Sequence, residues 1–552
     1  MPTIILNKKV FEKLVGKKLS EEKLKERISY LGTDLESIEG NEIHVEVFPN
    51  RPDMLSEQGF SRAFSTFVGT KKGMAEFKVE KSGEKVVIDK SLKDIRPYTA
   101  CAIIKNLRFD DEKIREIVQI QEKLHVTYGR NRKKAAIGIY PYERIKPPVY
   151  FFAGDPKKVR FIPLESDREM TGLEILSKHP AGREYAHLME GLDKFAFFRD
   201  SEGKILSMTP ITNSHDTGKI TEETKEVFVE CSGFDFDVLS ICLNIIVTAL
   251  SDMGGKIYSM DLEYPDRKLT TPNLSPKKMK LDLDYINRRI GLSIKESEAK
   301  RLLERMGYGY EKKNVLVPAY RADILHQADL AEDIAIAYGY ENLKEDIPQV
   351  STIGQEDELN VFARKAAEAL TGLGLIETNT YNLIDKDVQT GMCNVDMGVV
   401  ELIDPVSSEY NSLRKWIIPS LLSVLKDNKH NEYPQRIFNI GTIFKKDKKN
   451  RTESGVSEAV RLGVMLCSRT AGFTEIKQVL DFLMRMLDID YSISETEHDS
   501  FIPGRVGRVS VKGKDVAYIG EIHPNVLENF DLDMPVSCFE LNLSDLHEAI
   551  QR

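Results

Sequence analysis

The chain has 552 residues, which is too long for a single hydrophobic core and predicts several domains. Hydrophobic residues make up 41% and charged residues 30%, as in well-packed soluble proteins, and the net charge of −9 argues against a general nucleic-acid clamp. Because no long apolar run and no signal-peptide pattern are present, we expect a cytoplasmic protein with no membrane contact. Six scattered cysteines without a CxxC pair predict reduced, buried thiols and not a zinc site.

Two segments, 10–69 and 285–339, resemble each other and predict two copies of one small α+β module. Each copy has two short helices, a strand-like run, an Arg-x-Asp element and a last helix, and each helix ends at a glycine. The glycines fall at matching spacings in the two copies: Gly16, Gly32 and Gly69, then Gly291, Gly307 and Gly339. The two Arg-x-Asp elements are Arg51–Asp53 and Arg321–Asp323.

The two copies differ in acidic residues. The second copy carries four acids, namely Asp323, Asp329, Glu332 and Asp333, and the aligned residues of the first copy are Asp53, Gly59, Arg62 and Ala63. Three of these acids share one face of the expected helix, and the fourth can reach the same end from the preceding loop. Clustered carboxylates repel one another unless a cation compensates, which favours a hard ion such as Mg²⁺. Acids that merely complement a helix dipole are the alternative, but they would serve both copies equally.

The middle of the chain predicts a mixed α/β domain, with strands at 149–152 and 226–230 and a helix at 236–252. The segment Tyr128–Lys134 has four cations in its last five residues, which indicates either a solvated loop or a contact with a nucleic-acid backbone. A strand is expected directly after it, at 135–139.

The segment Met208–Lys219 is rich in serine, threonine, asparagine, histidine and glycine. Its composition indicates either an ordinary loop or a small-molecule pocket lined by hydroxyl and amide groups. The contiguous residues 214–216 are not a catalytic triad, because neighbouring side chains project in different directions.

The last third of the chain predicts an antiparallel α+β domain that follows a linker at Pro348–Ser351. Its expected helices are 360–373 and 421–429, and its expected strands are 374–381, 436–444, 503–508 and 519–524.

These segments, together with Asn50–Asp53, Pro318–Leu325, Asp329–Ile334 and Tyr338–Tyr340, resemble the β subunit of phenylalanyl-tRNA synthetase in its shorter archaeal and eukaryotic form. The resemblance covers essentially the whole chain in the family's domain order. It implies a multidomain α+β fold in which twin small modules flank an α/β editing domain and precede a class II synthetase-like antiparallel domain. The expected bounds are 1–86 for the first module, 87–268 for the editing domain, 269–347 for the metal-carrying module and 352–552 for the synthetase-like domain.

The resemblance implies that the final domain lacks its own active site, because Asn439 stands where a working class II strand carries a glutamate. Activation chemistry and ATP then belong to the holoenzyme, an (αβ)₂ heterotetramer with an α subunit that attaches phenylalanine to tRNA(Phe). The family's Mg²⁺ ligands match Asp323, Asp329, Glu332 and Asp333, and the ion is shared with the α subunit.

The resemblance also implies that the middle domain hydrolyses mischarged tyrosyl-tRNA(Phe), with Asn213, Ser214 and Thr217 as contacts in the editing pocket. A second hydrolytic site is physically reasonable, since an apolar pocket discriminates poorly against a substrate that adds one hydroxyl. The alternatives are a non-enzymatic scaffold or nucleic-acid-binding protein derived from a synthetase, and a free-standing deacylase.

Overall fold

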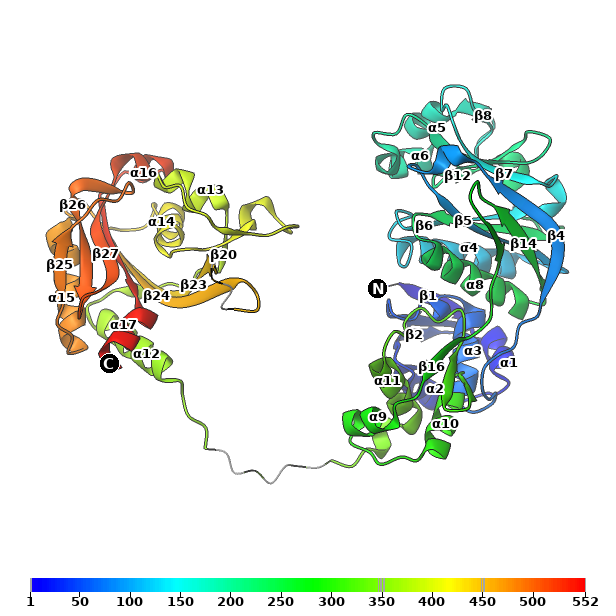
Figure 1. The fold of residues 1–552 in the computed structure, drawn as a ribbon, viewed down its shortest axis with the longest axis horizontal. Helices are drawn as coiled ribbons and strands as arrows, with labels where there is room; N and C mark the ends of the chain where they lie inside the picture. Colours follow the sequence, from blue (N-terminus) through cyan, green and yellow to red (C-terminus); the bar gives the residue numbers. More distant parts are fainter. Residues whose placement is uncertain are drawn as a thin grey trace. The chain divides into compact units, whose positions relative to one another are not determined.

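The computed structural model describes residues 2–345, 347, 350, 353–447, 449 and 452–551. The chain forms two compact units, Met1–Ile347 and Pro348–Arg552 (Figure 1). The division coincides with the predicted linker Pro348–Ser351, which lies outside the described residues except for Val350.

The internal repeat is confirmed element by element. The first module contains β1 (Thr3–Asn7), α1 (Lys8–Val15), α2 (Glu21–Tyr30), β2 (Asp34–Glu39), β3 (Glu42–Glu46) and α3 (Glu57–Phe67). The second contains β16 (Lys277–Lys280), α9 (Leu283–Ile290), α10 (Glu296–Arg305), β17 (Gly309–Glu311), β18 (Asn314–Val317) and α11 (Gln327–Tyr338). Both three-stranded sheets have the same order, β1-β3-β2 and β16-β18-β17. The sequence comparison missed the opening strand of each copy.

The matching glycines end the helices in the same way in both modules. Gly16 follows α1 at φ +74° and Gly291 follows α9 at φ +70°, a left-handed conformation that glycine adopts without a steric penalty. In each case the glycine N–H donates to the carbonyl four residues earlier, on Glu12 or Asn287, and so satisfies a helix end.

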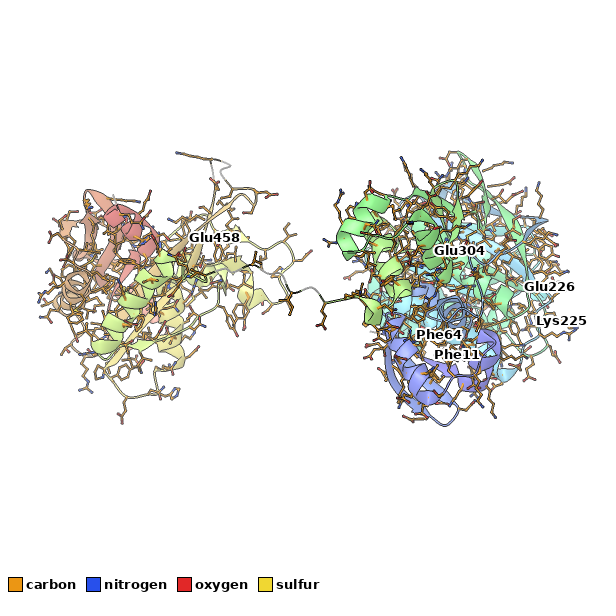
Figure 2. The ribbon with its side chains drawn as sticks, turned by 90° about the horizontal axis from the view of Figure 1, so that it is seen from below. Phe11, Phe64, Lys225, Glu226, Glu304 and Glu458 are labelled. Atoms are coloured by element: carbon orange, nitrogen blue, oxygen red, sulfur yellow. The ribbon has the colours of Figure 1, made fainter. Side chains whose placement is uncertain are left out.

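The two modules flank the middle domain in the sequence but share one hydrophobic core in the folded unit. In the first module the rings of Phe11 and Phe64, labelled in Figure 2, lie with their centroids 5.2 Å apart. The same core continues through Leu239 on the middle domain's long helix and Ile334 on α11. Neither module therefore buries its apolar face alone.

Between the modules in sequence lies a ten-stranded sheet of order β12-β11-β10-β7-β4-β14-β5-β13-β6, with β15 paired to β14. Its strands are β4 (Val79–Ile88), β5 (Tyr98–Lys105), β6 (Ala135–Pro141), β7 (Val149–Gly154), β10 (Phe195–Arg199), β11 (Ile205–Thr209), β12 (Thr212–Asn213), β13 (Val227–Gly233), β14 (Lys256–Glu263) and β15 (Lys268–Thr271). Two further short strands, β8 (Arg160–Phe161) and β9 (Met170–Thr171), pair with each other. The helices are α4 (Asp111–Val126), α5 (Gly172–Lys178), α6 (Pro180–Tyr185), α7 (His215–Gly218) and α8 (Phe236–Asp252).

The predicted strands and the helix at 236–252 are confirmed in this sheet domain. The expected boundaries at residues 86 and 268 fall within β4 and at the start of β15, and both strands pair within the large sheet. The pairing of β4 with β14 is parallel and joins residues far apart in the chain, which local sequence patterns do not reveal.

The C-terminal unit is built on a seven-stranded sheet of order β19-β23-β24-β28-β27-β26-β25, antiparallel except for β19 beside β23. The strands of this sheet are β19 (Ile376–Glu377), β23 (Gln435–Lys446), β24 (Val456–Cys467), β25 (Ser492–Glu495), β26 (Phe501–Val511), β27 (Lys514–Ile522) and β28 (Val536–Asn542). A separate three-stranded sheet of order β20-β22-β21 consists of β20 (Leu383–Ile384), β21 (Val400–Glu401) and β22 (Ser412–Leu413). The helices of the unit are α12 (Glu358–Gly372), α13 (Lys386–Gln389), α14 (Ile418–Asp427), α15 (Phe473–Met486), α16 (Pro524–Asn529) and α17 (Leu543–Gln551).

Both faces of the seven-stranded sheet are covered. Alternate residues of β24 enter different cores: Val464 packs with α12, α15 and α17, whereas Met465 packs with α14 and α16. The predicted helices and most predicted strands are confirmed, but the strand expected at 374–381 is only two residues long. All six cysteines are buried and free of disulfides, as the sequence predicts.

Candidate functional site

The four acids singled out in the second module line one cavity. The cavity has a volume of about 130 Å³ and is also lined by Leu31, Gly32, Asn50, Arg51 and Ile336. Helix α11 supplies three of the acids, and its N-cap is His326, whose Nδ1 accepts a hydrogen bond from the Ala328 N–H at 3.2 Å. His326 therefore helps to start the helix, and the lining of the cavity does not include it.

Three of these carboxylates already have partners within the protein. Arg321 donates to both oxygens of Asp323, at 2.8 and 2.7 Å, and to Asp333 Oδ2 at 2.8 Å. Asp329 Oδ2 accepts from the N–H groups of Leu325 and His326, both at 2.7 Å. The arginine and the helix end thus compensate part of the clustered negative charge.

The fourth acid, Glu332, is affected by the negative charge of the other three carboxylates. Partial burial raises the pKa of its carboxyl, and the carboxylates of Asp333, Asp323 and Asp329 raise it further. Within the described part of the chain, no three His, Cys, Asp or Glu side chains already stand together as ligands of one ion. The four carboxylates in the lining nevertheless offer the kind of ligand that a hard cation such as Mg²⁺ prefers, namely carboxylate oxygen together with retained water.

A larger cavity, of about 500 Å³, lies in the middle domain. It is lined by α4, by β6 at one end of the strand order, and by the β11–β12 segment at the other end. Its polar walls include Ser207, Thr209, Asn213 and Glu230. Apolar groups such as Ile137 and Ile211 complete the lining, so the cavity combines an apolar body with a few polar groups, as ligand pockets do.

Glu230 is the buried acid of this cavity. It lies on β13, a strand whose residues are all buried, and its Oε1 accepts a hydrogen bond from the Tyr140 hydroxyl at 3.1 Å. Neither its Oε2 nor the Ser207 hydroxyl has a hydrogen-bond partner among the residues that the structure describes. Burial raises the pKa of Glu230 to about 7, although the charge of Arg96 opposes the shift. The lining of the cavity therefore includes a buried carboxyl that is partly protonated near neutral pH.

The side chains of the basic segment Tyr128–Lys134, predicted to be a solvated loop or a nucleic-acid contact, lie in two different environments. Arg130 and Lys133 are exposed, whereas Arg132 turns inward and lines the cavity. Arg132 donates to the carbonyl of Ile211 at 2.9 Å and to Glu122 at 3.1 Å, and its guanidinium lies 4.2 Å from the centre of the Tyr185 ring. Arg132 thus ties the segment between α4 and β6 to the turn between β11 and β12.

The three predicted editing contacts do not all reach the cavity. Asn213 lines it, whereas Ser214 and Thr217 are buried and are not part of its lining. The interpretation of residues 208–219 as an ordinary loop is wrong, since the segment contains the end of β11, the short strand β12 and the short helix α7. Sequence reasoning missed Glu230 and Ser207; an acid within the otherwise apolar run Val227–Cys231 was the available signal.

In the C-terminal unit, Asn439 is buried on β23. Its Nδ2 donates to the Thr378 carbonyl at 2.5 Å, and its Oδ1 accepts from Arg414 at 3.3 Å. Arg414 lies against Gly441, where an added Cβ would be 2.0 Å from the guanidinium. Arg414 therefore fills the space next to Asn439 and Gly441.

Large apolar side chains are exposed on two segments of the same unit. They are Ile376, Tyr381, Ile403, Val406 and Tyr410, and Ile403 is 97% exposed. The rings of Tyr381 and Tyr410 lie 5.8 Å apart, which brings the two segments together. Exposed apolar groups gathered in this way mark an interaction surface in many proteins.

No described helix has the length and apolar character needed to cross a bilayer.

Two family models match the chain: the phenylalanyl tRNA synthetase beta chain CLM domain over residues 343–543, and the tRNA synthetase B5 domain over residues 279–340. The B5 match contains α11 and all four acids of the acidic cavity.

Curated relatives match almost the whole chain. The phenylalanine–tRNA ligase beta subunit of Pyrococcus furiosus is 42% identical over 99% of this chain and 100% of its own length. The beta subunit of Thermococcus gammatolerans is 41% identical over 99% of both chains. Among solved structures, an N-terminal fragment of the phenylalanyl-tRNA synthetase β-subunit from Pyrococcus horikoshii covers 61% of this chain and all of the fragment, with a TM-score of 0.59 and 39% identity. The chain therefore belongs to the phenylalanine–tRNA ligase β subunit family and is a subunit of an aminoacyl-tRNA ligase.

Proposed function

We propose that this chain acts in the cytoplasm with an α subunit, as an (αβ)₂ heterotetramer, to attach phenylalanine to tRNA(Phe), and that it removes tyrosine attached by mistake. The observation that supports the editing proposal is the buried carboxyl of Glu230 in the lining of the 500 Å³ cavity, with one oxygen that has no hydrogen-bond partner among the described residues. In this proposal residues 87–268 are the editing domain, and residues 352–552 contribute structure but no activation chemistry.

The cavity provides what discrimination against phenylalanine requires. A tyrosine side chain fits an apolar pocket as phenylalanine does, but only its phenol can donate a hydrogen bond to Glu230 Oε2. A bound phenylalanine leaves this buried oxygen unsatisfied, which is the situation in which proteins reject a substrate lacking one hydroxyl most strongly. Hydrolysis then needs only a water held at the ester by polar groups at the cavity wall, such as Ser207 and Asn213, without a protein nucleophile.

The test is deacylation of tyrosyl-tRNA(Phe) by the holoenzyme carrying Glu230→Gln. Because the amide presents a neutral oxygen in place of the carboxylate, we expect the kcat/KM to fall about 10- to 100-fold. The exposed Glu222, near the same strand, gives the matched control Glu222→Gln, which should retain the wild-type rate. An unchanged rate in Glu230→Gln would remove the basis of the editing proposal.

We also propose that Asp323, Asp329, Glu332 and Asp333 hold one Mg²⁺ shared with the α subunit. When bound, the ion neutralises carboxylates that otherwise repel one another, and the raised pKa of Glu332 supports this assignment. The double variant Asp329→Ala with Glu332→Ala should lose Mg²⁺ binding in calorimetry and weaken co-purification with the α subunit. Wild-type affinity for Mg²⁺ in this variant would contradict the ligand set.

The apolar surface around Ile403 and Val406 supports an α-subunit partner, since such a patch is costly to leave in water.

The filled space at Asn439 and Arg414 supports activation of phenylalanine by the partner alone. The purified chain without its partner is therefore expected to give no ATP–pyrophosphate exchange with phenylalanine. Exchange by the lone chain would place the activation site here.

A further inference from the structure

The internal repeat relates the acidic cavity to a second pocket in the N-terminal unit. The acidic cavity is lined by α11, by Asp323 and by the end of α2 at Leu31 and Gly32. The second pocket, of about 200 Å³, is lined by α3, by Asp53 and by the residues after α10, Met306 and Gly307. Each module thus contributes its last helix to one pocket and a helix end to the other, so the two pockets are equivalent positions of the repeat.

The charge of the lining is reversed between the two pockets. Where α11 carries Glu332, α3 carries Arg62, and the other acids on α11 are replaced by Gly59 and Ala63. Five cationic side chains line the second pocket, namely Arg51, Arg62, Lys71, Lys72 and Arg321, against two carboxylates, Asp53 and Asp252. A cavity rich in cations attracts an anion for the same reason that its counterpart suits a cation.

Two buried polar groups of this pocket have no hydrogen-bond partner in the part of the chain that the structure describes. They are Gln58 Oε1 and Ser61 Oγ, on residues that are 6% and 2% exposed. The second module has Ala328 and Ala331 at the equivalent positions, so the fold of the module does not require polar side chains there. Buried polar groups without partners are rare because they cost free energy, so these two indicate a ligand.

The buried arginines are already compensated. Arg51 binds both oxygens of Asp53 at 2.8 Å, and Arg62 binds Asp252 Oδ2 at 2.6 Å. Arg321 is held by acids of the other cavity. The two remaining cations of the lining are Lys71 and Lys72, which are exposed, and the charge of Lys71 also acts on Asp252.

We propose that this pocket binds a small oxyanion of the phosphate class. The Ser61 hydroxyl and the ammonium groups of Lys71 and Lys72 donate to its oxygens. The Gln58 amide donates as well once it is turned, since the oxygen and nitrogen of an amide exchange places by rotation. The pocket shares no lining residue with the proposed editing cavity, and Ser61, Lys71 and Lys72 do not line the acidic cavity.

The test is calorimetric titration of the full chain with inorganic phosphate, with EDTA present and the ionic strength held constant with chloride. We expect one saturable site, at least about tenfold weaker in Ser61→Ala and in Lys71→Ala with Lys72→Ala, because each change removes a donor to a charged oxygen. The matched control is Lys17→Ala with Lys18→Ala, which removes the same charge from the exposed turn after α1 and should bind as the wild type does.

Three results would overturn the proposal. They are the absence of saturable binding up to about 10 mM phosphate, equal weakening by the two lysine pairs, and unchanged affinity in both pocket variants. The lysine pair is exposed and the serine is buried, so a folding defect in Ser61→Ala leaves the lysine comparison decisive.

Discussion

Glu230→Gln is expected to make the stability of the ten-stranded sheet less dependent on pH. The buried Glu230 carboxyl has a pKa of about 7 against an ordinary value of 4.5, because burial disfavours its charged form. The folded protein therefore holds this proton more tightly than the unfolded chain does. The carboxyl's contribution to the free energy of unfolding is fully present below pH 4.5 and is lost as the pH rises through 7. Because each tenfold difference in proton affinity corresponds to roughly 1.4 kcal/mol, the loss amounts to about 3 kcal/mol.

Hydrogen exchange of the β13 and β5 amides is the suitable measurement. The single tryptophan, Trp416, lies in the C-terminal unit, so its fluorescence does not report on this sheet. Exchange rates between about pH 5 and 8, corrected for the intrinsic pH dependence of exchange, give the local opening free energy. The pKa values of Glu57 and Glu116 are also raised by burial, but both titrate alike in the wild type and the variant and cancel in the comparison.

The glutamine has the shape of the carboxyl and does not titrate, so the opening free energy of the variant should fall less with rising pH. Glu222→Gln, at an exposed position, should follow the wild type. If the wild type and Glu230→Gln lose the same free energy over this range, the pKa of the carboxyl is not raised as its burial implies, and the reasoning fails.

Three further predictions concern packing and assembly. Gly138→Ala should destabilise the sheet domain by about 1–3 kcal/mol, since a Cβ there would lie 2.2 Å from the Tyr140 hydroxyl; an unchanged thermal midpoint would contradict this. Phe64→Ala should lower the free energy of unfolding, measured with denaturant, by about 3–5 kcal/mol, because it leaves a cavity in the core that the modules share. A decrease below about 1 kcal/mol would mean that neighbouring side chains repack into the cavity. Ile403→Asp with Val406→Asp should change stability by less than about 0.5 kcal/mol and prevent co-purification with the α subunit; retained co-purification would exclude this surface.

Local patterns in the sequence predicted much of the fold. The repeat was visible because each module ends its helices at glycines, and α8 was visible because Phe236–Asp252 has the pattern of an amphipathic helix. The four acids could be grouped because they lie within one helix and the loop before it, where spacing determines which side chains meet. The comparison with the first module separated a candidate site from ordinary charge on a helix.

The sequence alone therefore determined the family, the two modules and the acidic group on α11. Only the tertiary structure placed Glu230 and Asn213 on one cavity, because they come from strands separated by most of the sheet order and meet through long-range pairing. The same holds for the cationic pocket, whose walls come from both modules and α8. Side chains within one helix meet through local geometry, whereas side chains on distant strands meet only when the chain packs around its core.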